Sequence, residues 1–144
     1  MKLMFDTNVL LDMLLRREPF YRAAKTIITD CAKGNHRGVI LASNITDIFY
    51  IAQREGAKLH PLYLAMEELF ELLLICEVKP ADIMRAMDRK ELDFEDCLLA
   101  VCAKRTGCDA IVTRNAQDFE NAGIKVISPE EAGQCAINAE TIKQ

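Results

Sequence analysis

The sequence predicts an α/β fold in which a central, mostly parallel sheet is covered on both faces by helices. Short apolar, β-branched runs alternate with longer stretches whose apolar residues recur at helical spacing. Strands separated by helices are typical of parallel βαβ units. No linker, repeat or low-complexity segment interrupts this alternation, so the 144 residues suit one domain with a real core.

The first part of the chain alternates strand and helix. Lys2–Phe5 reads as a buried strand, and Val9–Leu15 as a helical stretch. Apolar residues then recur at helical spacing over 20–31, and Gly34 ends that pattern. The compact run Gly38–Ala42 predicts a second strand.

The middle of the chain repeats the alternation. Ser43 is expected to cap a third helix. A long amphipathic helix follows over Leu59–Leu73, and a third strand over Ile75–Val78. Pro80 closes that strand and fits the first turn of the next helix.

The last part of the chain predicts two more strands. An apolar stripe from Phe94 ends near Gly107, and strands follow at Asp109–Thr113 and Lys125–Ile127. Ser128–Glu131 then opens a final helix, with a capping-box spacing and a proline at its first position.

Composition predicts an ordinary globular protein, with 51% hydrophobic and 28% charged residues. We expect a single domain over residues 1–132 and a polar C-terminal tail over 133–144. No stretch resembles a secretory signal or is long enough to span a bilayer, so we expect a cytoplasmic protein without a membrane partner.

The cysteines and charges narrow the function classes. Six cysteines occur without a C-x-x-C pair, and His36 and His60 lie apart from any cysteine pair, which disfavours zinc and favours buried, reduced thiols.

The net charge of −4 argues against a strongly basic nucleic-acid binder. Local basic clusters keep RNA binding open, although a solvated helix end is the stronger interpretation of each: Arg16, Arg17, Arg22 and Lys25; residues 33–37; and Lys104, Arg105 and Arg114.

Four aspartates fall near the ends of the apolar runs. Asp6 follows the first strand, Asp47 the second and Asp118 the fourth, while Asp96 begins the helix that starts near Phe94. Ligands of open parallel sheets bind beyond the carboxyl ends of the strands, and Asp96 joins this edge only if its helix points its N-terminus there. Gathered carboxylates favour a hard divalent cation such as Mg²⁺ or Mn²⁺, and therefore phosphate chemistry.

Each acid also has a structural explanation. Asp6 can cap the helix that follows it, and Asp47 suits the helix dipole. Asp93 and Asp96 have the spacing of an N-cap and its third-position partner, which Asn115 and Asp118 repeat. Caps have no need to converge on one sheet edge, so the joint pattern favours a site.

Four segments together resemble a PIN domain, a family that includes the toxin ribonucleases of VapBC-type modules. They are Phe5–Asp12, Ala42–Ile48, Asp93–Asp96 and Thr113–Phe119, and the similarity runs in order to about Ile127. The resemblance implies a three-layer α/β/α sandwich with a mostly parallel five-stranded sheet. It also implies a ribonuclease that cuts single-stranded RNA with Mg²⁺ or Mn²⁺, a homodimer and an antitoxin partner.

The resemblance carries over residue by residue, with the same four acids as catalytic residues and metal ligands. Asp6 and Asp96 correspond to direct ligands. Asp47 stands where the family usually has glutamate, so its shorter side chain would reach the metal through water. The last ligand is Asp118 or Asn115, of which we favour Asp118.

Further residues are assigned as supports. Asn8 would hold the Asp6 loop, with Ser43, Asp93, Thr113 and Asn115 as polar neighbours. Candidate RNA-backbone contacts are Arg16, Lys104 and Arg114.

Three alternatives stay open. A haloacid-dehalogenase-type phosphatase needs a second aspartate where this chain has Asn8, and a receiver domain needs adjacent acids and a later lysine that are not found. A catalytically silent PIN-like module that binds RNA or protein would accommodate the departures at Asp47 and Asn115.

Overall fold

The computed structural model of the protein describes residues 1–90 and 93–143. The elements in chain order are β1 (Lys2–Phe5), α1 (Thr7–Leu14), α2 (Tyr21–Ala32), β2 (Arg37–Leu41), α3 (Ala42–Arg54), α4 (Leu59–Leu72), β3 (Leu73–Cys76), α5 (Pro80–Met87), α6 (Phe94–Arg105), β4 (Ala110–Val112), the 3₁₀ helix η1 (Ala116–Phe119), β5 (Lys125–Ile127) and α7 (Pro129–Lys143).

The strands form one five-stranded sheet in the order β3-β2-β1-β4-β5, and every neighbouring pair is parallel. The chain steps outward from β1 to β3, then returns to the other side of β1 for β4 and β5. The strand order therefore reverses between β1 and β4, and the carboxyl ends of these two strands form the switch point where such sheets bind ligands. The predicted parallel α/β fold is confirmed.

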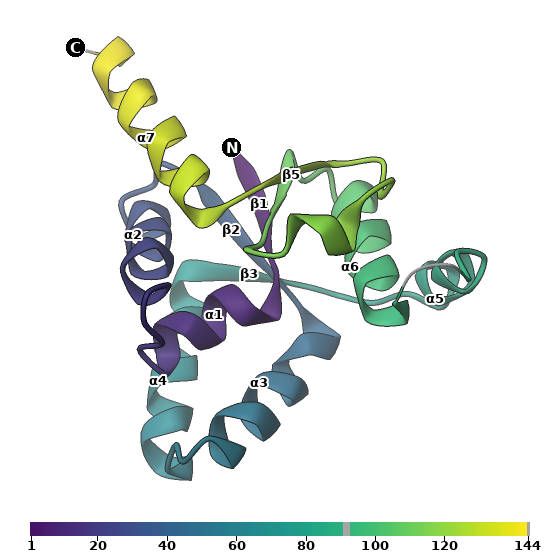
Figure 1. Cartoon of the computed structure of the whole chain (residues 1–144), viewed down its shortest axis with the longest axis horizontal. Coiled ribbons are helices and arrows are strands. Elements are labelled where there is room, and N and C mark those ends of the chain that lie inside the picture. Colours follow the sequence, from purple (N-terminus) through teal and green to yellow (C-terminus); the bar gives the residue numbers. More distant parts are fainter. Residues whose placement is uncertain (91–92, 144) are drawn as a thin grey trace.

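Alternation along the strands divides the core into two layers. Leu3 and Phe5 of β1 belong to a buried cluster with α1, α2, α3 and α4, whereas Met4 between them belongs to a second cluster with α5 and α6. Successive strand residues point to opposite faces, so each face needs its own helices. Figure 1 shows α5 and α6 on one side of the sheet, with α1, α2 and α4 on the other.

The third strand begins earlier than the sequence predicts. β3 covers Leu73–Cys76 rather than Ile75–Val78, because its register pairs Leu73 with Gly38 and Cys76 with Leu41 of β2. Leu73 also continues the helical spacing of the preceding segment, so the local pattern assigned it to the helix. Pairing with β2 decided the boundary.

Two helix starts test the capping predictions. Ser43 is not a cap: α3 begins at Ala42, directly from β2, with Leu41 at the N-cap position and no side-chain capping bond. Ser128 behaves as predicted, because its Oγ accepts from the backbone N–H of Glu131 at 3.1 Å. Pro80 is the first residue of α5, as expected.

The last helix, α7, includes most of the residues that the sequence analysis assigned to a polar tail. α7 runs to Lys143 and packs along α2 (Figure 1), with Ala132 and Ala136 buried. The sequence-based boundary at residue 132 falls inside this helix.

Two further observations concern the whole chain. Within the described residues, we find no helix with the length and apolar character needed to cross a membrane. All six cysteines are free thiols, and Cys31, Cys97 and Cys102 are buried as predicted.

Candidate functional site

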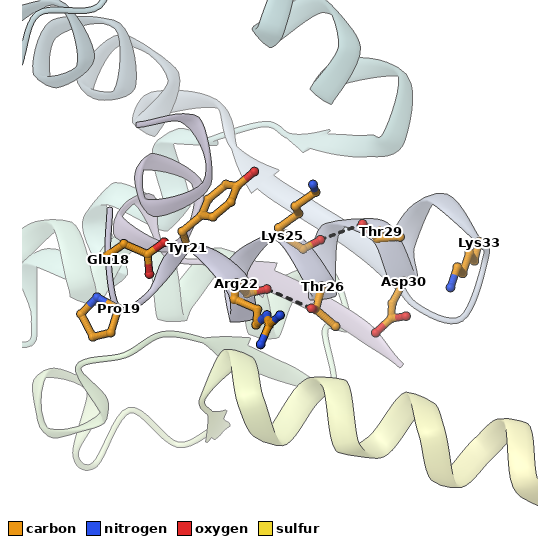
Figure 2. Close-up of a pocket in the computed structure, with 9 residues that line it drawn as sticks. All are labelled: Glu18, Pro19, Tyr21, Arg22, Lys25, Thr26, Thr29, Asp30 and Lys33. Atoms are coloured by element: carbon orange, nitrogen blue, oxygen red, sulfur yellow. Dashed lines mark hydrogen bonds between the residues drawn. The ribbon is translucent and has the colours of Figure 1, made fainter. Parts of the chain in front are cut away.

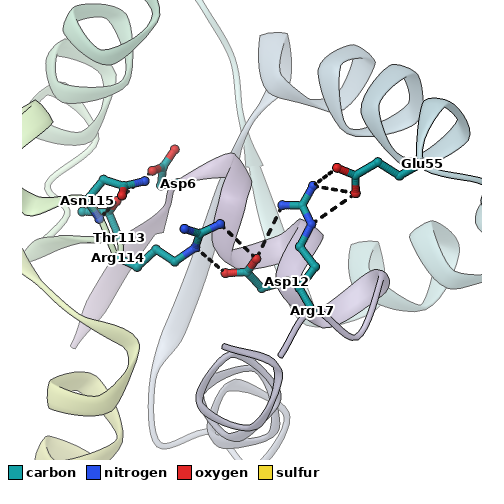
Figure 3. A network of polar contacts seen from close by, with 7 residues as sticks. All are labelled: Asp6, Asp12, Arg17, Glu55, Thr113, Arg114 and Asn115. Atoms are coloured by element: carbon teal, nitrogen blue, oxygen red, sulfur yellow. Dashed lines mark hydrogen bonds and ion pairs between the residues drawn. The ribbon is translucent and has the colours of Figure 1, made fainter. Parts of the chain in front are cut away.

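Asp6 stands at the switch point of the sheet. Its backbone N–H donates to the carbonyl of Val112 at 3.0 Å, which joins the ends of β1 and β4. Thr113 follows β4 and is only 1% exposed, and its hydroxyl donates to Asp6 Oδ2 at 2.8 Å. The backbone N–H of Asn115 donates to the same hydroxyl oxygen at 3.0 Å (Figure 3). These three residues are thus brought together at one edge.

The Asp6 carboxylate is not used as a helix cap. Asp6 occupies the N-cap position of α1, but its side chain makes no capping hydrogen bond there. Burial raises the pKa of Asp6, the Thr113 hydrogen bond opposes that rise, and the negative charge of Asp118 adds to it. Asp118, on η1, therefore lies close enough to act on Asp6.

The N-terminus of α6 supplies further acids to this edge. Asp93 is the cap, since its Oδ1 accepts from the backbone N–H groups of Glu95 at 3.0 Å and Asp96 at 3.3 Å. Asp96 is half-buried, and burial raises its pKa to about 7, with further contributions from the charges of Asp6, Asp93, Asp118 and Glu95. Helix α6 therefore points its N-terminus at the edge that Asp6 occupies.

Glu95 is a member of this cluster that the sequence reasoning missed. Burial raises the pKa of Glu95, and the charges of Asp47, Asp93 and Asp6 raise it further. Asp47 acts on Glu95 but is not among the larger influences on Asp6 or Asp96, so it lies at the margin of the cluster. The acid-rich run 93–96 was the available signal.

The chemistry of this edge fits a hard divalent cation, for which carboxylate and hydroxyl oxygens are the preferred ligands. Thr7 Oγ1 and Asn44 Oδ1, which follow β1 and β2, are buried and have no hydrogen-bond partner within the described part of the chain. Such atoms are rare in folded proteins and indicate a missing polar partner. Within the described segments, no three acidic, histidine or cysteine side chains lie together in a group that could hold a metal ion.

A second polar network lies beside the first, around the buried carboxylate of Asp12 (Figure 3). Arg114 Nε lies 2.8 Å from Asp12 Oδ2, and the Arg114 guanidinium stacks 4.1 Å from the centre of the Phe20 ring. Arg17 Nη1 lies 3.5 Å from Asp12 Oδ1 and Arg17 Nη2 2.7 Å from Glu55 Oε2. Sequence reasoning missed this network, although a charged residue inside an apolar helical stretch was a signal.

The predicted RNA contacts lie in different surroundings. The Arg114 guanidinium is engaged within the protein, while Arg16 is exposed with its Cζ 6.0 Å from the centre of the Tyr21 ring. Lys104 is exposed eight residues beyond Asp96 on α6, roughly 12 Å along the helix axis. Their contacts with RNA stay predictions.

Two predicted supports occupy the first turns of helices at this edge. Asn8 lies in α1 and is half-buried, and Ser43 lies in α3 and is exposed. Their supporting roles also stay predictions.

A groove of about 760 Å³ lies elsewhere, along α2 and the loop before it (Figure 2). Its lining comes from residues between Glu18 and Lys33 and includes none of the acids at the sheet edge. Cavity volume therefore does not mark the candidate site.

The fold and this edge of the sheet define the class of protein: a parallel α/β protein with clustered acids at its switch point. The PIN domain family model matches residues 2–117, so the chain belongs to the PIN domain family. The chain is also similar to Ribonuclease VapC1 of Aquifex aeolicus, with 25% identity over 138 residues that cover 90% of this chain and 92% of that protein.

Solved structures show the same fold. A toxin–antitoxin complex from Klebsiella pneumoniae has 24% identity and a TM-score of 0.64, covering 88% of this chain and 96% of that one. VapBC-1 from nontypeable Haemophilus influenzae has 17% identity and a TM-score of 0.66, covering 90% and 99%. VapBC2 from Rickettsia felis, bound to a DNA fragment from its promoter, has 14% identity and a TM-score of 0.65, covering 89% and 98%.

Proposed function

We propose that this protein is a metal-dependent endoribonuclease that hydrolyses phosphodiester bonds of single-stranded RNA. The observation that supports this best is the place of Asp6 at the switch point, where the Thr113 hydroxyl holds its carboxylate and where the charges of Asp6 and Asp118 act on the half-buried Asp96. Carboxylates held this way favour a cation between them. The similar Aquifex aeolicus protein is named a ribonuclease.

In this proposal Asp6, Asp96 and Asp118 would hold Mg²⁺ or Mn²⁺, with Asp47 acting through water. The cation would supply a water of lowered pKa and a positive charge beside the phosphate. The hydroxyl of Thr113 orients Asp6 through its 2.8 Å hydrogen bond. The positive end of the α6 dipole favours negative charge at this edge.

We further propose that the protein is the toxin of a toxin–antitoxin module and forms a homodimer. The support is the likeness to chains from toxin–antitoxin complexes, together with apolar side chains exposed on the surface. Helix α4 offers an apolar face for this dimer, because Leu59, Tyr63 and Leu64 are about half exposed. The adjoining edge strand β3 exposes two more apolar side chains.

A silent RNA- or protein-binding module is the second candidate, favoured by the marginal position of Asp47. The family match lends no support to the phosphatase and receiver alternatives.

The first experiment measures thermal stability with Mn²⁺ and with EDTA for wild type, Asp6→Asn and the control Asp88→Asn, whose side chain is exposed at the end of α5. At a metal concentration 100 times Kd, binding adds about 2.7 kcal/mol of stability. We expect this gain in wild type and Asp88→Asn and its loss in Asp6→Asn. Equal gains in all three proteins would contradict the site.

The second experiment measures cleavage of single-stranded RNA. We expect the Asp6→Asn, Asp96→Asn double variant to be inactive. Cleavage that persists in it would contradict the mechanism, and metal stabilisation without any cleavage by wild type would favour the silent module.

A further inference from the structure

We infer that Asp12 is a positioning residue, whose buried carboxylate holds together the three segments that bear Asp6, Asp47 and Asp118. The inference rests on the proposed metal-binding function of those acids. The contacts of Asp12 belong to the second network, which lies beside the contacts of Asp6 (Figure 3).

The contact between Asp12 and Arg114 is enclosed and directional. Arg114 Nε donates to Asp12 Oδ2 at 2.8 Å and Arg114 Nη2 to Asp12 Oδ1 at 3.4 Å, so the guanidinium forms hydrogen bonds with both carboxylate oxygens. The Asp12 side chain is 2% exposed and that of Arg114 27%. An enclosed charge pair is little screened by salt, and two parallel hydrogen bonds fix the orientation of the guanidinium as well as its position.

This contact attaches the β4–η1 loop to α1 at a second point. Thr113 donates to Asp6 at the start of α1, and its neighbour Arg114 reaches Asp12 further along the same helix (Figure 3). The Phe20 ring supports the guanidinium at 4.1 Å. Two attachments prevent the loop from pivoting about one hydrogen bond. Asp118 lies in η1, four residues after Arg114, so both attachments bear on its position.

The same carboxylate is linked to α3 through Arg17. Arg17 Nη1 lies 3.5 Å from Asp12 Oδ1, and Arg17 donates to both oxygens of Glu55 at 2.7 and 2.8 Å. Glu55 is the C-cap of α3, the helix that bears Asp47. The Glu55 side chain is 46% exposed, so this arm is the weaker one.

The test compares Asp12→Asn with Asp82→Asn. Asp82 is also a fully buried aspartate held by an arginine, with Arg105 Nε at 2.8 Å, but it lies on α5. Both variants should melt below wild type in EDTA. Only Asp12→Asn should weaken Mn²⁺ binding, by roughly 10- to 100-fold in the Kd obtained from a thermal-shift titration.

Arg114→Lys keeps the positive charge but loses the paired hydrogen bonds, and it serves as the test if Asp12→Asn does not fold. We expect an intermediate Kd for Mn²⁺, with kcat on single-stranded RNA reduced and KM unchanged. If both variants bind Mn²⁺ with the wild-type Kd, or if Asp82→Asn weakens binding as much as Asp12→Asn, the positioning role is wrong. If wild type itself gains no stability from Mn²⁺, the proposed function fails and this inference fails with it.

Discussion

At the scale of single residues, the hydroxyl of Thr113 decides how the Asp6 carboxylate is held. Burial disfavours the charged form of Asp6, and the hydrogen bond from Thr113 favours it. Thr113 itself is fixed by the backbone of β5, because its N–H donates to the carbonyl of Ile127 at 3.0 Å. The orientation of Asp6 therefore depends on β4, which Thr113 follows, and on β5, which holds Thr113 in place.

The change Thr113→Val tests this dependence, since valine has nearly the same shape but no hydroxyl. The substitution removes the largest influence that opposes burial and lowers the pKa of Asp6, so we expect Mn²⁺ affinity to fall by roughly 10-fold or more. A thermal-shift titration measures the affinity. Thr29→Val is the control, since its hydroxyl donates only to the carbonyl of Lys25 within α2, and an unchanged Kd for Thr113→Val would refute the role.

Two substitutions can show whether Asn115 or Asp118 is the last metal ligand. Asn115 touches Thr113 through its backbone N–H, which alanine retains, whereas the charge of Asp118 acts on both Asp6 and Asp96. We expect Asn115→Ala to keep the wild-type Mn²⁺ affinity and Asp118→Asn to lose roughly 10-fold or more. The reverse result in the same titration would assign the position to Asn115.

At the scale of elements, the two layers of helices depend on close contacts with the sheet. Gly38 in β2 is such a contact, because an added Cβ would lie 3.1 Å from Cys31 Sγ of α2 and 2.7 Å from Phe5 Cε2 of β1. On the other face, Asp82 of α5 and Arg105 of α6 form a buried ion pair at 2.8 Å. Each feature makes a prediction.

Gly38→Ala should destabilise the protein by about 1–3 kcal/mol, because the neighbouring side chains have no room to shift freely. Gly133→Ala should instead stabilise α7 by up to about 1 kcal/mol, since alanine is the better helix former. The nearest atom to a Cβ at position 133 would be Thr26 Cγ2 at 3.7 Å, an ordinary van der Waals contact. Urea unfolding measures both, and equal signs would contradict this account of the packing.

Asp82 should make stability depend on pH in the acid range. The Arg105 hydrogen bond lowers the pKa of Asp82 in the folded state, so its contribution is complete above its unfolded pKa near 4 and is lost as the pH falls below that value. Breaking such a buried pair with Asp82→Asn should cost about 3–5 kcal/mol at pH 7. Unfolding curves from pH 7 to pH 2.5 should show this difference from wild type shrinking below about pH 4. A constant difference would exclude the linkage.

At the scale of the whole molecule, the reversal of strand order between β1 and β4 gathers the acids, and it also leaves β3 at one edge of the sheet. Leu74 and Ile75 on β3 are about half exposed. An apolar edge strand is a ready surface for pairing with another chain.

The proposed homodimer predicts a mass of two chains in size-exclusion chromatography with light scattering. We expect a Leu74→Lys, Ile75→Lys double variant to elute as a single chain, because two charges would be buried unpaired at the interface. Ile142→Lys, on an 85% exposed side chain of α7, should leave the mass unchanged. A single-chain mass for wild type would contradict the dimer.

Local patterns predicted the elements well but not their boundaries. Leu73 suits both the helical spacing before it and the strand after it, and only its pairing with Gly38 assigns it to β3. Ser43 has the chemistry of a cap, but β2 runs directly into α3 one residue earlier. Both errors arise because an end is decided by a partner distant in sequence.

The sequence by itself determined the fold class and the order in which the acids follow the strands, because periodicity and strand ends are local properties. Only the tertiary structure decided which charges act on one another. The tertiary structure places the start of α6 where the charge of Asp6 acts on Glu95 and Asp96, and it brings Arg114 to Asp12, 102 residues away in the sequence. Helix orientation and loop path follow from packing against both faces of the sheet, which spacing along the chain does not encode.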